Sequence, residues 1–338
     1  MVLAASDQEA VPFTAMDDVT VGSPARGDAV VETHGLTKRF GSRLALDAVD
    51  LTVPAATAFG FLGPNGAGKT TLIRTLLGLT RPNGGTFRLL GRPMPEGRPA
   101  ALRRVGAIVE EPRFHPHLTG RENLRIVAAA REPAADARIA PALARVGLAD
   151  RADERVKAYS MGMRQRLGVA RCLLADPLLL ILDEPMNGLD PAGIQEFREM
   201  IAELTAEGRT VFLSSHLLDE VEKTCEQVAI IDGGRILMQG AVADIGRTGR
   251  PTVRLRCEPL DRAIEVVRVH PSAASVEASG DALVVVLSTE PGPATDGAVA
   301  DLTRSLVEAG VAVYALEPQR VSLEARFLEM TSRLEVTK

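Results

Sequence analysis

A glycine-rich segment limits the fold of this chain more than any other part of its sequence. Gly63-Pro64-Asn65-Gly66-Ala67-Gly68-Lys69-Thr70 matches the pattern G-x-x-x-x-G-K-[ST], with an apolar run before it and apolar residues at helical spacing after it. Such glycines let backbone N–H groups face a polyphosphate, and the following helix adds partial positive charge. Lys69 would contact the β- and γ-phosphates and Thr70 would bind Mg²⁺. The pattern therefore predicts a strand–loop–helix unit that binds a nucleotide.

Two further polar groups follow apolar segments. The run Leu178–Leu182 is apolar throughout and ends at Asp183-Glu184, as a buried parallel strand would. Ligands of open α/β sheets bind at this edge, where one carboxylate can hold Mg²⁺ through water and the next can orient or deprotonate an attacking water. His216 also follows a predicted strand and would lie beside the γ-phosphate if the two strands are neighbours.

The order of predicted elements divides the 338 residues into two domains and a tail. Alternating strands and helices over 29–240 predict an α/β domain with a mainly parallel sheet and a helical part at about 119–175. Glycines and a proline mark a boundary near 240–251. Beyond it, 251–338 predicts a small α+β domain that ends in a helix over 323–330. Residues 1–28 are acidic and predict a disordered tail.

Composition excludes several classes of protein. The formal net charge is −5 and aromatic residues make up 3% of the chain, so neither a basic surface nor a ring-stacking surface for nucleic acid is indicated. The three cysteines have no metal-site or disulfide spacing. The sequence offers no apolar stretch of about 20 residues for a membrane span, and its first basic residue is Arg26, which argues against a signal peptide. We therefore expect a cytoplasmic protein.

Taken together, the motifs resemble those of the ATP-binding-cassette (ABC) ATPases. The segment 160–166 (SMGMRQR) resembles the signature loop of that family, 187–190 (NGLD) its D-loop, and 214–216 (SSH) its switch histidine. The resemblance covers about 29–240. It implies a P-loop cassette with a mainly parallel core sheet, an antiparallel β part and a helical subdomain.

The resemblance also implies a site shared between two copies of the chain. In a head-to-tail homodimer, Ser160 and Gly162 of one copy close over the ATP that the other copy holds. Phe40 stands where the family stacks an aromatic ring on adenine, although a core Phe at a strand end is the alternative. The implied catalytic residues are Glu184 and His216, and the implied metal-binding residues are Thr70, Asp183 and Glu110. The implied nucleotide-binding residues are Phe40, Gly63, Pro64, Asn65, Gly66, Ala67, Gly68, Lys69, Thr70, Thr71, Ser160, Gly162 and Asp190.

The sequence departs from the family pattern at three positions. Glu110 stands where the Q-loop normally has Gln, and it adds negative charge near the γ-phosphate. Met161 and Met163 replace a Gly and a Gln of the signature loop. The stretch 109–124, with its Glu, is similar to ATPases of the bacitracin-resistance and lantibiotic-immunity exporters. The C-terminal segment 321–328 is similar to the tail of drug-export ATPases, although it also fits a merely amphipathic helix.

The function implied by this resemblance is that of an ATP-hydrolysing subunit that drives transmembrane permease partners. Such a subunit would bind no nucleic acid and would contact the membrane only through the permease. It would lie on the inner face of the cell membrane and export an antibiotic, a peptide or another hydrophobic compound. A soluble ABC ATPase that acts on nucleic acid or ribosomes is the alternative. A small-molecule phosphotransferase would not need the segment that begins at Ser160.

Overall fold

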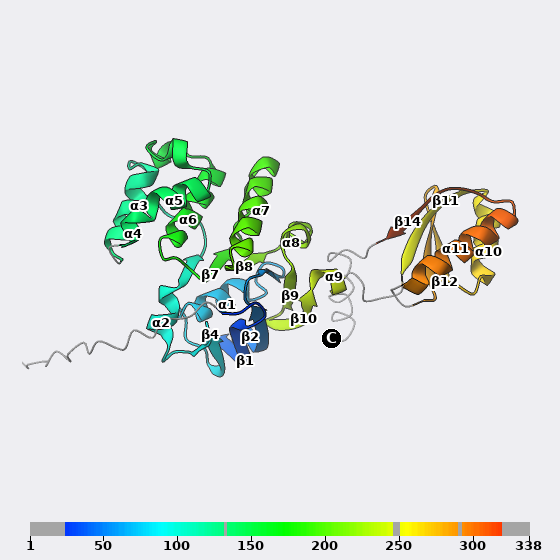
Figure 1. Cartoon of the computed structure of the whole chain (residues 1–338). Coiled ribbons are helices and arrows are strands. Elements are labelled where there is room, and N and C mark those ends of the chain that lie inside the picture. Colours follow the sequence, from blue (N-terminus) through cyan, green and yellow to red (C-terminus); the bar gives the residue numbers. More distant parts are fainter. Residues whose placement is uncertain (1–23, 132–133, 246–250, 290–292, 320–338) are drawn as a thin grey trace, which may run out of the picture.

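The computed structural model describes residues 24–131, 134–245, 251–289 and 293–319. Figure 1 shows the helices between residues 119 and 175 gathered on one side of the cassette, away from β1 (Ala29–Phe40) and β2 (Arg43–Pro54). Two sheets build the cassette, and a third belongs to the C-terminal domain. The predicted final helix and residues 1–23 of the predicted acidic tail lie outside the described residues.

The central sheet has six strands in the order β10-β9-β3-β8-β7-β6. Five of them are parallel and β10 is antiparallel to β9, which confirms the predicted mainly parallel sheet. The turn between β9 and β10 is Gly233-Gly234, as the sequence predicts. The strands are β3 (Ala58–Leu62), β6 (Val105–Ile108), β7 (Leu179–Asp183), β8 (Thr210–Ser215), β9 (Gln227–Asp232) and β10 (Arg235–Ala241).

Apolar side chains cover both faces of this sheet. Phe59 and Phe212 stack on one face, with their ring centroids 5.8 Å apart. Leu62 and Leu213, which point the other way, pack against the helical part of the cassette. Because both faces are buried, the five parallel strands are apolar without alternation, and only their ends carry polar groups. The polar residues of the site therefore gather at one edge.

An antiparallel sheet packs on one face of the central sheet, and helices surround the other. Its order is β2-β1-β4-β5, with β1 (Ala29–Phe40), β2 (Arg43–Pro54), β4 (Gly84–Leu89) and β5 (Arg92–Pro93). The cassette helices are α1 (Lys69–Leu76), α2 (Arg98–Arg103), α3 (Gly120–Ala129), α4 (Ala134–Ala137), α5 (Ile139–Arg145), α6 (Met161–Leu173), α7 (Pro191–Ala206), α8 (Leu218–Thr224) and α9 (Val242–Ile245). Two 3₁₀-helices, Ala149–Arg151 and Val156–Ala158, join α5 to α6.

The C-terminal domain has the element order β-α-β-β-α-β. Its antiparallel sheet runs β12-β13-β11-β14, which is the split βαβ, ferredoxin-like arrangement. The inward side chains of β11 and β13, with those of the two helices, form a separate core. The elements are β11 (Thr252–Glu258), α10 (Leu260–Val269), β12 (Ala273–Ser279), β13 (Ala282–Leu287), α11 (Pro293–Glu308) and β14 (Ala312–Gln319).

The sequence-based boundaries of several elements are wrong. The sequence predicts a helix over 301–309, but this helix begins at Pro293, because proline is well suited to the first turn of a helix. The apolar spacing after the glycine loop predicts a helix over 69–79, but this helix ends at Leu76, because Gly78 turns the chain with φ 68°. Within the described ranges, none of the helices is both long and apolar enough to cross a membrane.

Candidate functional site

The glycine-rich loop connects β3 to α1 at the carboxyl edge of the central sheet. A Cβ at Gly63 would lie 2.2 Å from the Ile231 carbonyl oxygen, and one at Gly68 would lie 2.5 Å from that of Ala45. Gly68 also has φ 115°, a backbone conformation that residues with a side chain rarely adopt. The loop can therefore keep this close path only with glycine at these positions, as a backbone cradle for phosphates requires.

Lys69 connects the loop to the end of β7. Its side chain is only 6% exposed. The ammonium donates to the Gly63 carbonyl oxygen at 2.6 Å and lies 3.2 Å from Glu184 Oε1. A buried ammonium needs such partners, and the phosphates of a nucleotide would compete with Glu184 for it.

Thr70, Asp183 and Ser214 form a second group of contacts. The Thr70 hydroxyl donates to Asp183 Oδ2 at 2.9 Å. The Ser214 hydroxyl donates to the other oxygen, Oδ1, of this buried carboxylate. A hydroxyl beside a carboxylate is a suitable donor set for Mg²⁺ next to a polyphosphate, so the residues present fit this ion.

Glu184 and His216 meet across β7 and β8, which are neighbouring strands as the sequence analysis requires. His216 Nδ1 lies 2.8 Å from Glu184 Oε2. Glu184 has φ 48°, a conformation that is rare for a residue other than glycine. Its backbone N–H donates to the Ser214 hydroxyl at 3.0 Å. The Glu184 side chain is therefore held between Lys69 and His216.

Of these site residues, Lys69, Thr70 and Glu184 line a cavity of about 360 Å³. Phe40 lines it and is 51% exposed, so it is not a core residue. The Lys38 ammonium lies 4.8 Å from the centroid of its ring. The cavity is lined by Phe40, Arg43, Ala45, Pro64, Asn65, Gly66, Gly68, Lys69, Thr70, Thr71 and Glu184.

Arg43 and Ser214 have local roles that the sequence analysis did not assign. Arg43 donates to the Gly66 carbonyl oxygen at 3.0 Å and so braces the loop from β2. Ser214 contacts both acidic residues that end β7. The motif around Ser214 is visible in the sequence, but the contacts of both residues join segments far apart in the chain. Pattern alone could not reveal them.

The structure places the signature residues away from this cavity. Ser160 caps α6: its hydroxyl accepts from the Met163 N–H at 3.2 Å, and the residue is exposed. Asp190 caps α7 by accepting from the Gly193 N–H at 3.0 Å. Gly162 faces Leu189, with 3.6 Å between a Cβ built on the glycine and the leucine side chain. Ser160, Gly162 and Asp190 are not among the residues that line the cavity of their own chain.

Glu110 also lies apart from the other predicted metal-binding residues. Its carboxylate forms an ion pair with Arg74 of α1, and the Glu110 side chain is 62% exposed. Thr70 and Asp183 are brought together, whereas Glu110 turns to the far end of α1. The structure thus assembles two of the three predicted residues.

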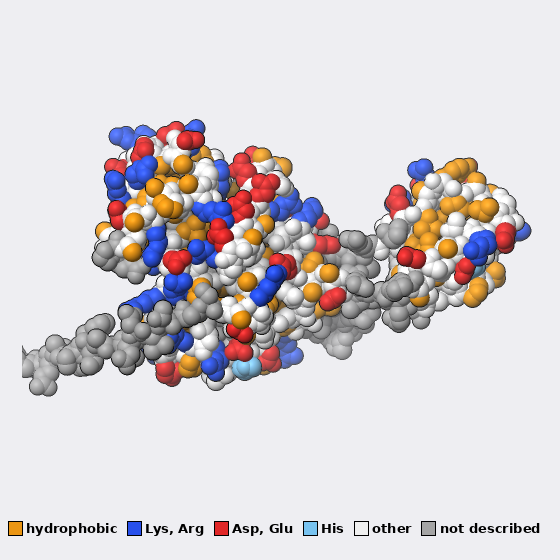
Figure 2. Space-filling model, in the orientation of Figure 1, with side chains coloured by type: hydrophobic (Ala, Val, Ile, Leu, Met, Phe, Trp, Pro, Cys, Tyr) orange, Lys and Arg blue, Asp and Glu red, His pale blue; other side chains and the backbone are white. Residues whose placement is uncertain are grey.

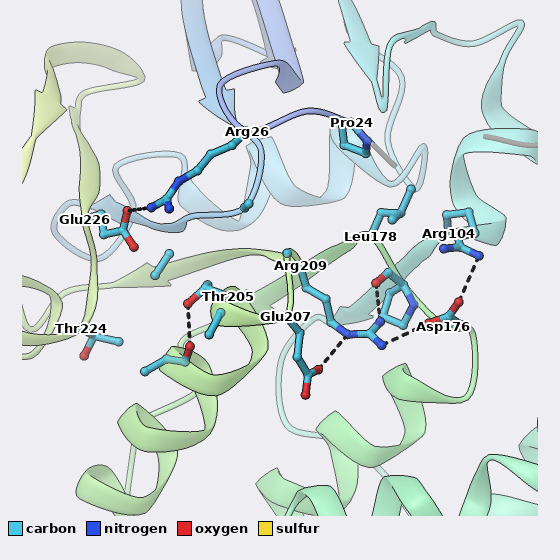
Figure 3. A pocket seen from close by; sticks show the side chains of 16 residues that line it. Pro24, Arg26, Arg104, Asp176, Leu178, Thr205, Glu207, Arg209, Thr224 and Glu226 are labelled. Atoms are coloured by element: carbon cyan, nitrogen blue, oxygen red, sulfur yellow. Dashed lines mark hydrogen bonds and ion pairs between the residues drawn. The ribbon is translucent and has the colours of Figure 1, made fainter. Parts of the chain in front are cut away.

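A larger cavity of about 800 Å³ lies at the opposite edge of the sheet, beside the amino ends of β3 and β7 (Figure 3). It is lined by three arginines and three acidic residues, which pair with one another. Asp176 binds both Arg104, at 3.2 Å, and Arg209, at 3.1 Å. Because its charges are balanced internally, this cavity does not attract a polyphosphate as the smaller one does.

Comparisons with known proteins agree with this geometry. The family model for the ABC transporter matches residues 46–187. The chain is 37% identical over 306 residues to the bacitracin transport ATP-binding protein BcrA of Bacillus licheniformis, covering 89% of this chain and 97% of the relative. It is 35% identical to the Nod factor export ATP-binding protein I of Cupriavidus metallidurans, over 90% of this chain and 98% of the relative.

A solved structure of the ATP-binding subunit of an ABC transporter is also similar. It is 31% identical, has a TM-score of 0.57, and covers 64% of this chain and 92% of its own. The matched part corresponds to a single cassette. The motifs, the arrangement of the sheet edge and these relatives lead to one conclusion: the chain belongs to the ATP-binding subunits of ABC transporters, which are ATPases.

Proposed function

We propose that this chain hydrolyses ATP as the energy-coupling subunit of an exporter. The observation that carries the proposal is the meeting of Lys69, Glu184 and His216 beside the glycine loop. Thr70 and Asp183 stand next to them. One edge of the sheet thus holds a phosphate-binding ammonium, a donor set for Mg²⁺ and a carboxylate that can accept a proton.

Each residue has a separate task in this proposal. Lys69 leaves Glu184 and binds the β- and γ-phosphates. Glu184, once released, accepts a proton from the attacking water, while His216 holds the carboxylate through its Oε2. Thr70 and Asp183 would hold Mg²⁺, which would supply positive charge beside the phosphates. Phe40, half exposed at the rim of the cavity, offers its ring to the adenine.

The exposed Ser160 supports a site completed by a second copy. It begins a helix of 13 residues, and the N–H groups of such a helix start attract phosphate. Gly162, two residues further on, has no side chain between the start of this helix and an approaching group. Since neither residue lines the cavity of its own chain, we propose that two chains bind head to tail around two ATP molecules. ATP binding closes this homodimer and hydrolysis reopens it.

Permease partners and export are also part of the proposal. The names of the similar ATP-binding proteins, for bacitracin transport and for Nod factor export, support a transported compound of antibiotic, peptide or other hydrophobic character. Because the cassette must meet its permease, we place it at the cytoplasmic face of the cell membrane.

The test is a comparison of the wild-type chain with Glu184→Gln in the cells that produce it. If the chain powers an exporter, it fractionates with the membrane, and the variant raises cellular accumulation of a hydrophobic peptide antibiotic such as bacitracin. Recovery of the chain in ribosome fractions that nuclease disperses, with unchanged accumulation, would favour the nucleic-acid alternative.

A further inference from the structure

Arg74 and Glu110 form an ion pair beside the nucleotide site. Arg74 belongs to the last turn of α1, the helix that begins with Lys69 and Thr70. Arg74 lies five positions after Lys69, so the two differ by about 7.5 Å along the helix axis at 1.5 Å per residue. One helix thus presents a phosphate-binding ammonium at its start and a guanidinium to Glu110 near its end.

The backbone of Glu110 lies close to the catalytic edge. Ile108 pairs with Leu182 in the parallel register of β6 and β7. Two residues beyond each of them stand Glu110 and Glu184, so these residues follow neighbouring strands at the same edge. Neighbouring strands are about 4.8 Å apart. The backbones of Glu110 and Glu184 therefore follow neighbouring strands, although the Glu110 carboxylate itself is paired with Arg74.

The Glu110 carboxylate contacts α1 and is not among the groups that line the nucleotide cavity. The Glu110 backbone has φ 66°, and its carboxylate pairs with Arg74. The next residue, Glu111, lies 3.8 Å from Arg164 of α6. Adjacent glutamates are thus held by arginines from two different helices. Arg74 thus pairs with the charge of Glu110, whereas Asp183 is contacted by Thr70.

We propose that Arg74 is a positioning residue for Glu110. The ion pair holds the carboxylate off the Mg²⁺ site, and loss of the pair frees it to serve as an additional oxygen ligand beside Thr70 and Asp183. This inference rests on the proposed function, because it concerns how Mg²⁺ and ATP bind at the same site. Exposed ion pairs are weak, so the position of Glu110 is easily shifted.

The experiment measures nucleotide binding rather than hydrolysis. A fluorescent ATP analogue is titrated into the full chain at increasing Mg²⁺ concentrations, for Arg74→Gln, Glu110→Gln and the double variant. Arg74→Gln should lower the Mg²⁺ concentration for half-maximal binding about two- to fivefold, the range of couplings between exposed ion pairs. The double variant should match Glu110→Gln, and Arg74→Lys should keep the wild-type value.

The control is Arg88→Gln, which removes an arginine 3.8 Å from Glu32 in the antiparallel sheet. It should not move the Mg²⁺ dependence. The inference would be overturned if replacing Arg74 by glutamine shifted the Mg²⁺ concentration for half-maximal binding equally in the wild-type chain and in Glu110→Gln. It would also be overturned if this replacement caused no shift in the wild-type chain. Failure of the wild-type chain to bind the analogue would instead refute the proposed function. If the wild-type chain binds the analogue and Lys69→Ala does not, the proposed function stands whatever the result for Arg74.

Discussion

Replacing Ser214 by alanine removes a buried hydroxyl that contacts both acidic residues at the end of β7. The hydroxyl donates to Asp183 Oδ1 and accepts from the Glu184 backbone N–H at 3.0 Å. Ser214 is 0% exposed, so water cannot readily replace it. The variant therefore leaves a carboxylate with one donor fewer and a backbone N–H without this acceptor.

The size of the effect follows from these two contacts. A hydrogen bond to a charged group contributes about 1.5–3 kcal/mol, and leaving a buried group without a partner costs about 1–3 kcal/mol. Because the two losses overlap at one atom, we expect the free energy of unfolding to fall by about 2–4 kcal/mol. Asp183 keeps the Thr70 hydroxyl, 2.9 Å from Oδ2, but can now rotate about it. ATP turnover should fall about tenfold, because misplaced catalytic groups lose rate steeply.

The assay combines urea unfolding, followed by circular dichroism, with steady-state ATPase measurements. The control is Thr33→Val, because the buried Thr33 hydroxyl donates to a neutral carbonyl, that of Val49, at 2.8 Å in the antiparallel sheet. This control should lose about 1 kcal/mol and leave nucleotide affinity unchanged. A Ser214→Ala chain within about 0.5 kcal/mol of wild type, with wild-type turnover, would refute the reasoning.

Three other variants give further tests. Gly68→Ala should abolish binding of a fluorescent ATP analogue, because its Cβ would lie 2.5 Å from the Ala45 carbonyl oxygen, whereas Gly91→Ala, with nothing within 4 Å, should bind normally. Glu184→Gln should still bind ATP but accumulate as a dimer in light scattering, and wild-type turnover in this variant would contradict its role as the base. Burial raises the pKa of the Cys172 thiol to about 11. Between pH 9 and about 11 this thiol ionises in the unfolded chain but not in the folded one, so the free energy of unfolding should fall more steeply with pH in wild type than in Cys172→Ala. Urea titrations at several pH values that give both chains the same pH dependence would contradict this.

Local patterns in the sequence predicted the parts of the site that depend on contiguous residues. The glycine loop and the Asp183-Glu184 pair are such parts, because each needs particular side chains next to a strand end. The mainly parallel sheet followed from strands that alternate with helices along the chain. His216 beside Glu184 also followed, since only the neighbouring position of two strands had to be assumed.

Contacts between distant segments could not be predicted in this way. Arg43 reaches Gly66, and Arg74 reaches Glu110, over separations that no sequence period encodes. The strands β4 and β12 were missed because glycines open β4 and small, exposed residues dominate β12. The start of α11 was missed because prolines and a glycine near its first turns resemble a loop.

The central claim is that each ATP is held by the loop of one copy and by Ser160 of the other. Two inactive variants, Lys69→Ala and Ser160→Arg, test it when they are mixed. Half of the dimers formed at random contain one chain of each variant. One of the two sites in such a dimer has both Lys69 and Ser160 intact, so about one quarter of all sites are complete. The mixture should therefore regain about one quarter of wild-type ATP trapping. A mixture that stays as inactive as the separate variants, while both still fold, would contradict the shared site.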